Sequence, residues 1–400
     1  MTLPIAWAAA RETVYAAGAG ALLPPVRVPL VDSDGLTLAE PLIALTDLPA
    51  FPTSSVDGWA VRGRAPWRII GQILAGMTAQ PLTEDGTCVE IATGGMVPAG
   101  TDAVIRVEES TMDGDVVLHG TPRPQADWRQ PGEEAKRGEE LMATGTPITP
   151  GVIGLAASCG YDTVACHPAP RAALLVFGDE LLTAGPPGEG RVRDALGPAL
   201  PSWLRRTGTD VVHLRAPVAD TLAEHVAAIR AAVDAGAQVI CTTGGTMNGP
   251  VDHLHPALAE LGATYLVNTV AVRPGFPMLV ARLPGGAFVC GLPGNPQSTF
   301  VALVTLVVPL LAGLTGRPLP ALPQATLGAD VAGRGDFTHL ALVRRDPDDG
   351  RFYGVPHVGS AMLRGLARSF GFAVVAPGTS APAGTSVPLV VLPVLEGERT

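Results

Sequence analysis

The sequence is poor in aromatic and charged residues. Phe, Trp and Tyr make up 4% of the 400 residues and Asp, Glu, Lys and Arg 16%, whereas hydrophobic residues reach 47%. Such a chain has ample material for buried cores, which Ala, Val and Leu must build, and it is longer than one core normally serves. We therefore expect two to four domains, joined by the many loops that 48 Gly and 39 Pro indicate.

An excess of basic residues is also lacking. The formal net charge is −10, whereas general nucleic-acid binding needs a basic surface. We therefore expect no nucleic-acid partner. An anionic small molecule stays compatible with the composition, provided that a local pocket supplies backbone amides, Arg side chains or a divalent cation.

Disulfide motifs, a secretory signal and a membrane span are not indicated either. The cysteines are odd in number and show no C-x-x-C spacing, which predicts buried free thiols in a reducing, cytoplasmic location; they are Cys88, Cys159, Cys166, Cys241 and Cys290. The most apolar run, 300–314, is shorter than a membrane span and contains Pro309. It therefore favours a buried helix, and we expect no membrane partner.

The most informative stretch runs from Ala237 to Asp252. The apolar residues 239–241 predict a strand buried on both faces. Three glycines and an Asn follow within 242–249, and they permit the positive φ angles that let backbone amides converge. Asp252 is expected to cap a helix over 254–261. A strand, an amide-rich loop and a helix N-terminus together make an anion site; an ordinary loop, in which the glycines only turn the chain, is the alternative.

A second stretch, 287–296, repeats this pattern. Another short apolar run ends in Leu292-Pro-Gly-Asn-Pro296, and Pro296 suits the first position of a helix. Ligands of open α/β sheets bind beyond the carboxyl ends of the strands. We therefore expect the two loops to border one pocket.

The surrounding pattern predicts strands at 172–177 and 211–214 and a helix over 220–235, with Thr221 and Glu224 as a capping box. This alternation is typical of a mostly parallel, three-layer α/β domain. Short apolar segments separated by turns over 68–118 predict a small β domain. A hairpin over 340–355, a helix over 361–368 and two later strands predict a further β domain near the C-terminus.

Taken together, these motifs resemble the MoeA and gephyrin E-domain family, the molybdopterin molybdenumtransferases. The resemblance rests first on Thr243-Gly-Gly with Asp252 and on the 292–296 loop. Further strings follow the family in the same order along nearly the whole chain. They contain Asp57-Gly58, Thr93-Gly94, Glu134, which stands where the family usually has Asp, and Glu180 within Phe-Gly-Asp-Glu-Leu.

The resemblance implies a multidomain fold of α/β and β parts. Residues 1–45 and 140–168 would form a discontinuous N-terminal linking domain, and 46–139 a small β domain. Residues 169–316 would form a three-layer α/β molybdopterin-binding, MogA-like domain, and 317–400 a C-terminal β-barrel-like domain.

The resemblance also implies an activity: insertion of molybdate into adenylylated molybdopterin with release of AMP, assisted by Mg²⁺, in a homodimer that meets other molybdenum-cofactor synthesis proteins. The implied catalytic residues are Asp57, Thr93, Glu180 and Asp252, of which Asp57, Glu180 and Asp252 would hold the metal. The implied substrate-binding residues are Glu134, Gly244, Gly245, Thr246, Asn248, Gly249, Arg273, Pro274, Gly275, Pro293, Gly294, Asn295, Pro296 and Ser298.

Several positions depart from the family pattern on the ligand side. The family's Asp-Ser-Asn appears as Asp194-Ala-Leu, its Lys-Pro-Gly-Lys-Pro as Arg273-Pro-Gly-Phe-Pro277, and a Ser of the glycine loop as Met247. Phe276 removes a cation that would bind phosphate. These changes are typical of a diverged paralogue, so the second hypothesis is a non-catalytic binder or scaffold for molybdopterin or the finished cofactor. The third hypothesis is a nucleotide hydrolase that shares the α/β domain. His253 and His255 are interpreted as structural.

Overall fold

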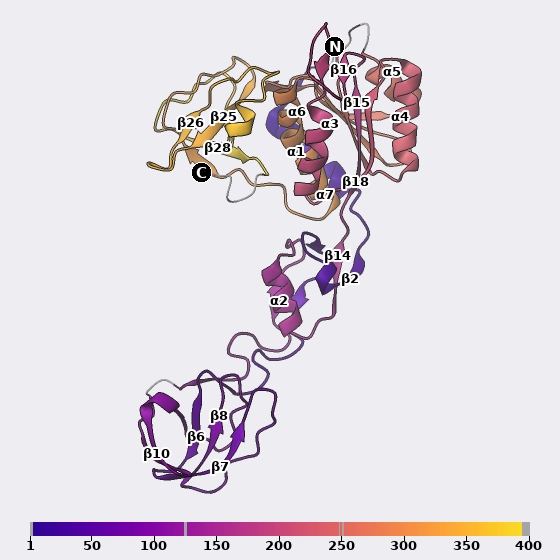
Figure 1. Cartoon of the computed structure of the whole chain (residues 1–400). Coiled ribbons are helices and arrows are strands. Elements are labelled where there is room, and N and C mark those ends of the chain that lie inside the picture. The colour runs from indigo at the N-terminus through magenta and orange to yellow at the C-terminus, as the bar shows by residue number, and fades with distance from the viewer. Residues whose placement is uncertain (1–2, 124–125, 248, 250–251, 394–400) are drawn as a thin grey trace. The chain divides into compact units, whose positions relative to one another are not determined.

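The computed structural model describes residues 3–123, 126–247, 249 and 252–393 (Figure 1). The chain forms two compact units. The first comprises residues 1–26, 35–39 and 166–400, and the second comprises 27–34 and 40–165. Each unit has hydrophobic clusters of its own.

A six-stranded sheet lies at the centre of the first unit. Its order is β18 (Asp210–Val218), β15 (Arg171–Phe177), β19 (Val239–Thr243), β23 (Phe288–Leu292), β22 (Leu279–Arg282) and β20 (Thr264–Asn268). The first four strands pair in parallel, and β22 pairs antiparallel with both β23 and β20. The prediction of a mostly parallel sheet is confirmed, with an antiparallel edge.

Helices cover both faces of this sheet, because its central strands are apolar on both sides. One face packs against α1 (Trp7–Ala19), α3 (Leu196–Arg206), α6 (Pro296–Ala302) and α7 (Val308–Leu314), and the other against α4 (Leu222–Asp234) and α5 (Leu254–Glu260) (Figure 1). Thr221 caps α4, since its side chain accepts a hydrogen bond from the Glu224 amide at 3.2 Å. The reciprocal half of the predicted capping box does not form, because the Glu224 carboxylate bonds to Arg215 and the Thr221 amide donates to the Ala219 carbonyl. The three-layer architecture is therefore confirmed.

The apolar helical run Pro296–Leu314 has the length and composition of a membrane span, yet 94% of that window is buried inside the protein. Its α7 end lies against α1 at two glycines. A Cβ on Gly313 would clash with the Tyr15 carbonyl oxygen, and one on Gly18 would clash with the Leu310 carbonyl oxygen. The predicted buried helix is therefore a core helix that requires small residues at this crossing.

Replacing Gly313 by Ala is expected to lower the free energy of unfolding by about 1–3 kcal/mol, because the added methyl overpacks the crossing of α1 and α7. Denaturant unfolding measures this change. Gly154→Ala in α2 (Pro150–Ser158) is the matched control, since among the described residues its Cβ meets open space. The control should stabilise by up to about 1 kcal/mol; equal effects of the two substitutions would contradict the packing argument.

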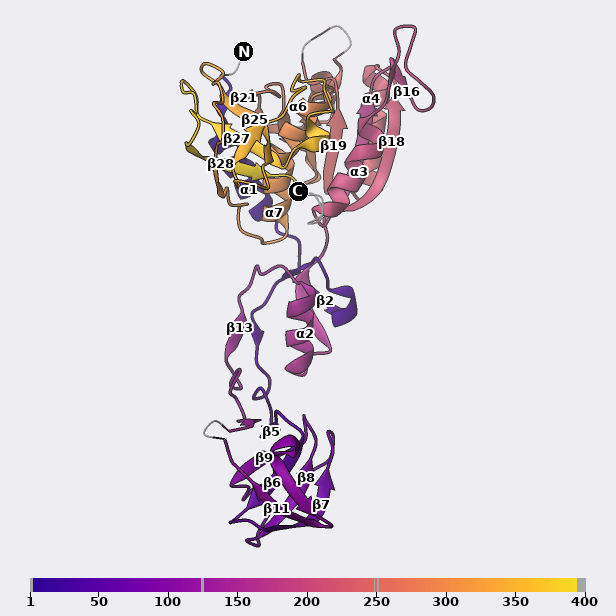
Figure 2. The same cartoon turned by 60° about the vertical axis from the view of Figure 1, so that its left-hand side comes forward.

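A second sheet in the first unit joins the C-terminal region to two earlier strands. Its order is β1 (Ile5–Ala6), β21 (Val270–Arg273), β25 (Thr338–Arg345), β27 (Gly371–Val375), β28 (Ser386–Val391) and β24 (Gln324–Thr326), with β26 (Phe352–Gly354) beside β25. Figure 2 shows β21, β25, β27 and β28 side by side. The parallel pairing of β21 with β25 places Arg273 opposite His339, so the α/β and C-terminal regions share one hydrogen-bonded sheet.

The predicted C-terminal hairpin and strands are confirmed by β25, β26, β27 and β28. The helix expected over 361–368 is wrong in extent, since only a 3₁₀ turn at Leu366–Arg368 forms. Gly365 lies close to the preceding loop, because a Cβ there would lie 2.7 Å from the His357 carbonyl oxygen. The turn therefore packs on its own loop instead of extending.

The second unit contains the predicted small β domain. Its sheet has the order β10 (Ser110–Asp113), β11 (Val116–Gly120), β7 (Trp67–Ile73), β8 (Thr87–Ile91), β6 (Gly58–Arg62) and β9 (Ala103–Arg106). The shorter strands β4 (Leu42–Ile43), β5 (Thr53–Ser54), β12 (Trp128–Arg129) and β13 (Glu140–Met142) pair outside it. All five cysteines of the chain lie in the described part and are buried free thiols, as predicted.

Candidate functional site

The glycine loop after β19 and the proline loop after β23 meet at the carboxyl ends of two neighbouring parallel strands. The pairing of Thr243 with Leu292 aligns the strand ends, and the Gly244 amide donates to the Leu292 carbonyl at 3.0 Å. A Cβ on Gly294 would lie 3.6 Å from the Gly244 Cα. Both loops border one cavity of about 640 Å³, here called the glycine-loop cavity, which confirms the expected geometry.

Most of the predicted residues of the α/β region line this cavity. They are Glu180, Gly244, Gly245, Thr246, Asp252, Pro293, Gly294, Asn295 and Pro296. Gly244 and Gly245 have φ angles of +87° and +66°, which only glycine adopts without strain. The predicted Asn248 lies outside the described residues.

Asp252 does not cap the following helix as expected. Its Oδ2 accepts a hydrogen bond from the Gly249 amide at 2.6 Å, and His253 occupies the position before α5 without a side-chain cap in the described part of the chain. The carboxylate therefore accepts from the Gly249 amide, three residues earlier in the same loop, instead of from the first amides of α5. The carboxylate is therefore held by the loop that borders the cavity.

Glu180 reaches the same cavity from the end of β15. Gly178, one residue after the strand, has φ +145°, and a Cβ on it would lie 2.7 Å from the Glu180 Oε2. The Glu180 carboxylate thus occupies space that only glycine leaves open. Two carboxylates, Glu180 and Asp252, enter the cavity from neighbouring strands.

Two carboxylates of this kind are compatible with a magnesium ion that is also bound by phosphate groups of a ligand. The described residues contain no group of three or more His, Cys, Asp or Glu that could hold a metal. Magnesium, however, is commonly bound by one or two carboxylates together with substrate phosphates and waters. Glu180 and Asp252 therefore fit a metal shared with the substrate, and they do not form a closed protein cage.

Arg193 is a lining residue that the sequence analysis missed. It belongs to β17 (Val192–Arg193), which pairs with β16 (Leu181–Leu182), and its Nη1 donates to the Leu182 carbonyl at 3.1 Å. Of the described residues that line the glycine-loop cavity, it is the single basic one. Its position after a turn-rich segment gave the sequence analysis no signal.

Asp194 serves the scaffold. Its Oδ1 accepts hydrogen bonds from the amides of Leu196 at 2.9 Å and Gly197 at 2.8 Å, so the carboxylate satisfies the first turn of α3. Leu196 is 5% exposed and packs in the main core. The Leu that replaces the family's Asn is therefore part of the core as well as the cavity wall.

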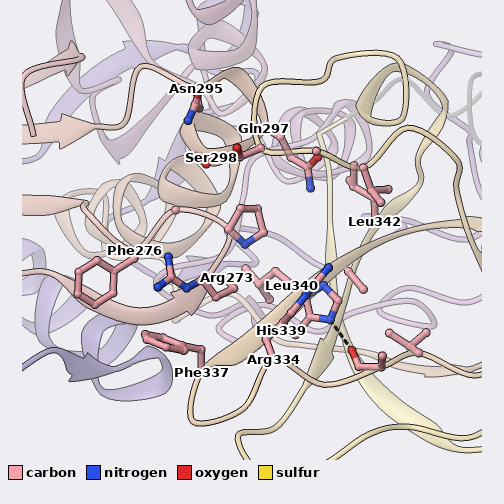
Figure 3. Close-up of a pocket in the computed structure, with 18 of the residues that line it drawn as sticks. Arg273, Phe276, Asn295, Gln297, Ser298, Arg334, Phe337, His339, Leu340 and Leu342 are labelled. Carbon is pink, nitrogen blue, oxygen red and sulfur yellow. Dashed lines mark hydrogen bonds between the residues drawn. The ribbon is translucent and has the colours of Figure 1, made fainter. Parts of the chain in front are cut away.

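Four more of the predicted residues of the α/β region line a second cavity of about 840 Å³, here called the Arg273 cavity (Figure 3), whereas the predicted Gly249 is not in the described lining of either cavity. The four are Arg273, Pro274, Gly275 and Ser298. Segments 330–342 and 354–360 of the C-terminal region form the opposite side. Pro277, Pro293 and Asn295 line both cavities. Most of the predicted substrate-binding residues of the α/β region are thus divided between two adjoining cavities.

A loop of the C-terminal region closes the start of α6. The Ser360 carbonyl accepts hydrogen bonds from the amides of Gln297 at 2.9 Å and Ser298 at 3.4 Å. Pro296 takes the first helical position, as predicted. The first amides of α6 are therefore satisfied within the protein, and the helix does not present them to a ligand.

The described lining of the Arg273 cavity is more basic than acidic, since it contains Arg273, Arg334 and His339 but one acidic residue, Asp330. Burial lowers the pKa of His339; the Ala332 carbonyl, 2.8 Å from Nδ1, raises it in part, and Arg334 lowers it. The net shift is downward, so the imidazole is mainly neutral near pH 7 and the two arginines supply the positive charge.

Asp57 and Thr93 lie in the second unit and contact each other. The Asp57 Oδ1 accepts a hydrogen bond from the Thr93 amide at 2.6 Å, and Asp57 lines a cavity of about 330 Å³ with Glu90. Gly58 is not a turn residue; it starts β6, where a Cβ would clash with the Ile105 carbonyl oxygen. Glu134, also in the second unit, is exposed, and its backbone amide donates to the Leu48 carbonyl.

The hydrogen bond from the Thr93 amide lowers the pKa of Asp57. We therefore expect its carboxyl to titrate, by carbon NMR, below the ordinary value of about 3.9. Because the folded-state pKa is lowered, this bond contributes stability above the ordinary pKa and loses it as the pH falls through the folded value. A midpoint at or above the ordinary value would contradict the observed contact.

The two histidines beside the glycine loop have structural partners. His255 is bonded through Nδ1 to the Tyr265 hydroxyl at 2.6 Å and through Nε2 to the Thr246 carbonyl at 3.4 Å. His253 packs edge-on against the buried His225, with ring centroids 5.8 Å apart. These contacts agree with the structural interpretation and tie the glycine loop to the sheet.

Three family models match successive parts of the chain. The MoeA N-terminal region (domain I and II) matches residues 5–160, a probable molybdopterin binding domain matches 173–313, and the MoeA C-terminal region (domain IV) matches 324–392. Together with the three-layer α/β fold, these matches define a multidomain molybdopterin-binding protein of molybdenum-cofactor biosynthesis.

Known relatives extend this result to nearly the whole length. The molybdopterin molybdenumtransferase of Synechococcus elongatus is 30% identical over 402 residues, which cover 96% of this chain and 98% of the relative. That of Haemophilus influenzae is 33% identical over 287 residues, 70% of each chain. The crystal structure of the molybdopterin biosynthesis moeA protein from Pyrococcus horikoshii OT3 matches with a TM-score of 0.80 at 20% identity, covering 97% and 100% of the two chains. The chain belongs to the MoeA family of molybdopterin molybdenumtransferases.

Proposed function

We propose that this protein inserts molybdate into adenylylated molybdopterin and releases AMP. One observation carries the proposal: two adjoining cavities at the carboxyl ends of the sheet differ in the charge of their walls. The wall of the glycine-loop cavity includes one arginine and three acidic residues, of which Asp194 is bonded to the start of α3, whereas the Arg273 cavity is basic. Two dissimilar cavities with common wall residues suit a reaction between two dissimilar substrates.

The glycine-loop cavity suits the adenylylated molybdopterin. Gly244, Gly245 and Gly294 let the substrate approach the backbone closely, and Arg193 offers a guanidinium to a phosphate. Glu180 and Asp252 would hold Mg²⁺, which, when bound, stabilises negative charge that develops on the phosphate oxygens. The residues of the chain thereby bind and orient the phosphoanhydride.

The Arg273 cavity suits molybdate, a small dianion. Arg273 and Arg334 supply positive charge, and Ser298 adds a hydroxyl near the residues common to both cavities. Guanidinium groups bind tetrahedral oxyanions through two parallel hydrogen bonds. Pro293 and Asn295, which line both cavities, mark where the two substrates would approach each other.

The proposal includes a homodimer in which Asp57 and Thr93 of one subunit act at the glycine-loop cavity of the other. Its support is the family resemblance and the contact that holds Asp57 and Thr93 together within one unit. A carboxylate held by a backbone amide in this way is rigid enough to act on a bound substrate.

The direct test is AMP release. Purified protein is incubated with adenylylated molybdopterin, molybdate and Mg²⁺, and AMP is separated by chromatography. We expect release that requires both molybdate and Mg²⁺ and that stops when the metal is chelated. If the substrate binds but no AMP forms at any Mg²⁺ concentration, the proposed activity is wrong.

A second candidate function is a non-catalytic carrier or scaffold for molybdopterin or the finished cofactor. The observations that favour it are Leu196, whose side chain belongs to the core, and Phe276, which replaces a cation in the wall of the Arg273 cavity. In that case molybdopterin should bind without turnover, and Asp252→Ala should leave its affinity unchanged.

A further inference from the structure

We propose that Phe276 and Phe337 hold the Arg273 guanidinium in the orientation in which it binds the oxyanion substrate, so that both rings act as positioning residues for this side chain. The inference rests on the proposed function, because it takes Arg273 as a ligand of molybdate. It gives Phe276 a role of its own, whereas the family pattern alone shows only that Phe276 replaces a lysine.

The geometry is a corner formed by two rings (Figure 3). The Arg273 Cζ lies 4.4 Å from the centroid of the Phe337 ring and 5.3 Å from that of Phe276. The two rings are 5.8 Å apart with an interplanar angle of 83°. A guanidinium within about 6 Å of a ring centroid is attracted by the negative face of the ring, so Arg273 is held from two directions.

Both rings are attached to well-fixed backbone. The Phe276 carbonyl accepts hydrogen bonds from the amides of Val270 at 3.1 Å and Met278 at 3.0 Å. Phe337 directly precedes β25, and the pairing of Val272 with Thr338 sets it beside Arg273. The corner is therefore built by the sheet that the α/β and C-terminal regions share.

This arrangement matters because Arg273 is exposed. A free arginine side chain samples many rotamers, and ordering it on a ligand reduces affinity. A side chain held in place before binding avoids part of that loss. A lysine at position 276, as in the family pattern, would instead repel the Arg273 charge, so Phe276 replaces a second cation with a group that orients the first.

The test measures molybdate affinity of the full-length protein by titration calorimetry. Phe276→Leu and Phe337→Leu remove the ring faces while keeping apolar volume, and each should weaken binding about two- to fivefold. Arg273→Ala should weaken binding about 10- to 100-fold. In the Arg273→Ala background, neither ring substitution should have a further effect, because the rings act only through the guanidinium.

Phe370→Leu is the matched control. Phe370 forms a T-shaped pair with Phe352, with centroids 5.5 Å apart, in the same region of the chain, and it does not belong to the described lining of the Arg273 cavity. This variant should retain wild-type molybdate affinity. A loss of affinity equal to that of Phe337→Leu would show a general packing effect and would overturn the inference.

A second measurement, by NMR, detects the two rings around the Arg273 guanidinium directly. The Arg273 Nε–H resonance should be shifted upfield by the two rings, and the shift should shrink in Phe337→Leu even where molybdate binding is too weak to measure. If Arg273→Ala weakens binding but both ring variants bind normally, the positioning role is wrong and the proposed function stands. If Arg273→Ala binds molybdate normally, the oxyanion role of the cavity is wrong, and the inference falls with it.

Discussion

Asp252→Asn should lower the rate of AMP release by about 100- to 1000-fold, because in the proposed function it removes one of the two carboxylates that would hold Mg²⁺ at the phosphoanhydride. The amide oxygen of Asn can still accept the hydrogen bond from the Gly249 amide, which Asp252 accepts at 2.6 Å. The loop should therefore keep its shape. Initial rates at saturating substrate, measured over a range of Mg²⁺ concentrations, separate the loss of charge from a loss of structure.

Glu260→Gln is the control for this prediction. It makes the same change of charge at the end of the following helix, where Glu260 is paired with Arg230 at 3.8 Å, and its rate should equal that of the wild type. In Asp252→Asn, part of the lost rate should return at high Mg²⁺. A variant that releases AMP at the normal rate, with an unchanged Mg²⁺ requirement, would remove Asp252 from the proposed chemistry.

Mixing two inactive variants should restore activity if the site is completed by a second subunit. Asp57→Ala and Asp252→Ala homodimers should each be nearly inactive. Subunit exchange gives heterodimers with one site that retains both carboxylates, so a fully exchanged equal mixture should reach about one quarter of the wild-type activity. AMP release before and after exchange is the measurement, and size-exclusion chromatography with light scattering establishes the dimer.

The same mixture decides between the two arrangements of the site. If Asp57 acts within its own chain, both kinds of subunit in the heterodimer stay defective, and exchange restores nothing. The Asp57→Ala variant alone, taken through the same exchange procedure, controls for changes in activity that the procedure itself causes. Activity that stays at the level of the single variants after demonstrated exchange would exclude the shared site.

The sequence predicted those parts of the fold that depend on local chemistry. The buried strand β19, the positive-φ glycines Gly244 and Gly245, and Pro296 at the start of α6 follow from residue type and spacing alone. The meeting of the two loops followed from the rule that parallel strands present their carboxyl ends at one edge. Local patterns therefore located the glycine-loop cavity without coordinates.

The Arg273 cavity could not be predicted in this way, because it depends on contacts between distant segments. Arg273 lies beside Phe337 only because β21 pairs with β25, and this register between distant segments leaves no trace in local periodicity. Asp252 was expected to cap a helix, but it bonds to Gly249 in its own loop. A carboxylate near several amides has alternatives that spacing alone does not separate.

The shared sheet has a consequence for how the chain can be divided. Residues 5–6, 270–273 and 338–345 are successive neighbours in it, so a fragment that stops near residue 316 would keep β1 beside β21 but lose β25 from its other edge. Such a strand edge, with unpaired amides and carbonyls, invites intermolecular association. Recombination between relatives at this sequence boundary would separate Arg273 from the ring that faces it. The Arg273 cavity therefore stays intact only when all the segments that build the shared sheet are inherited together.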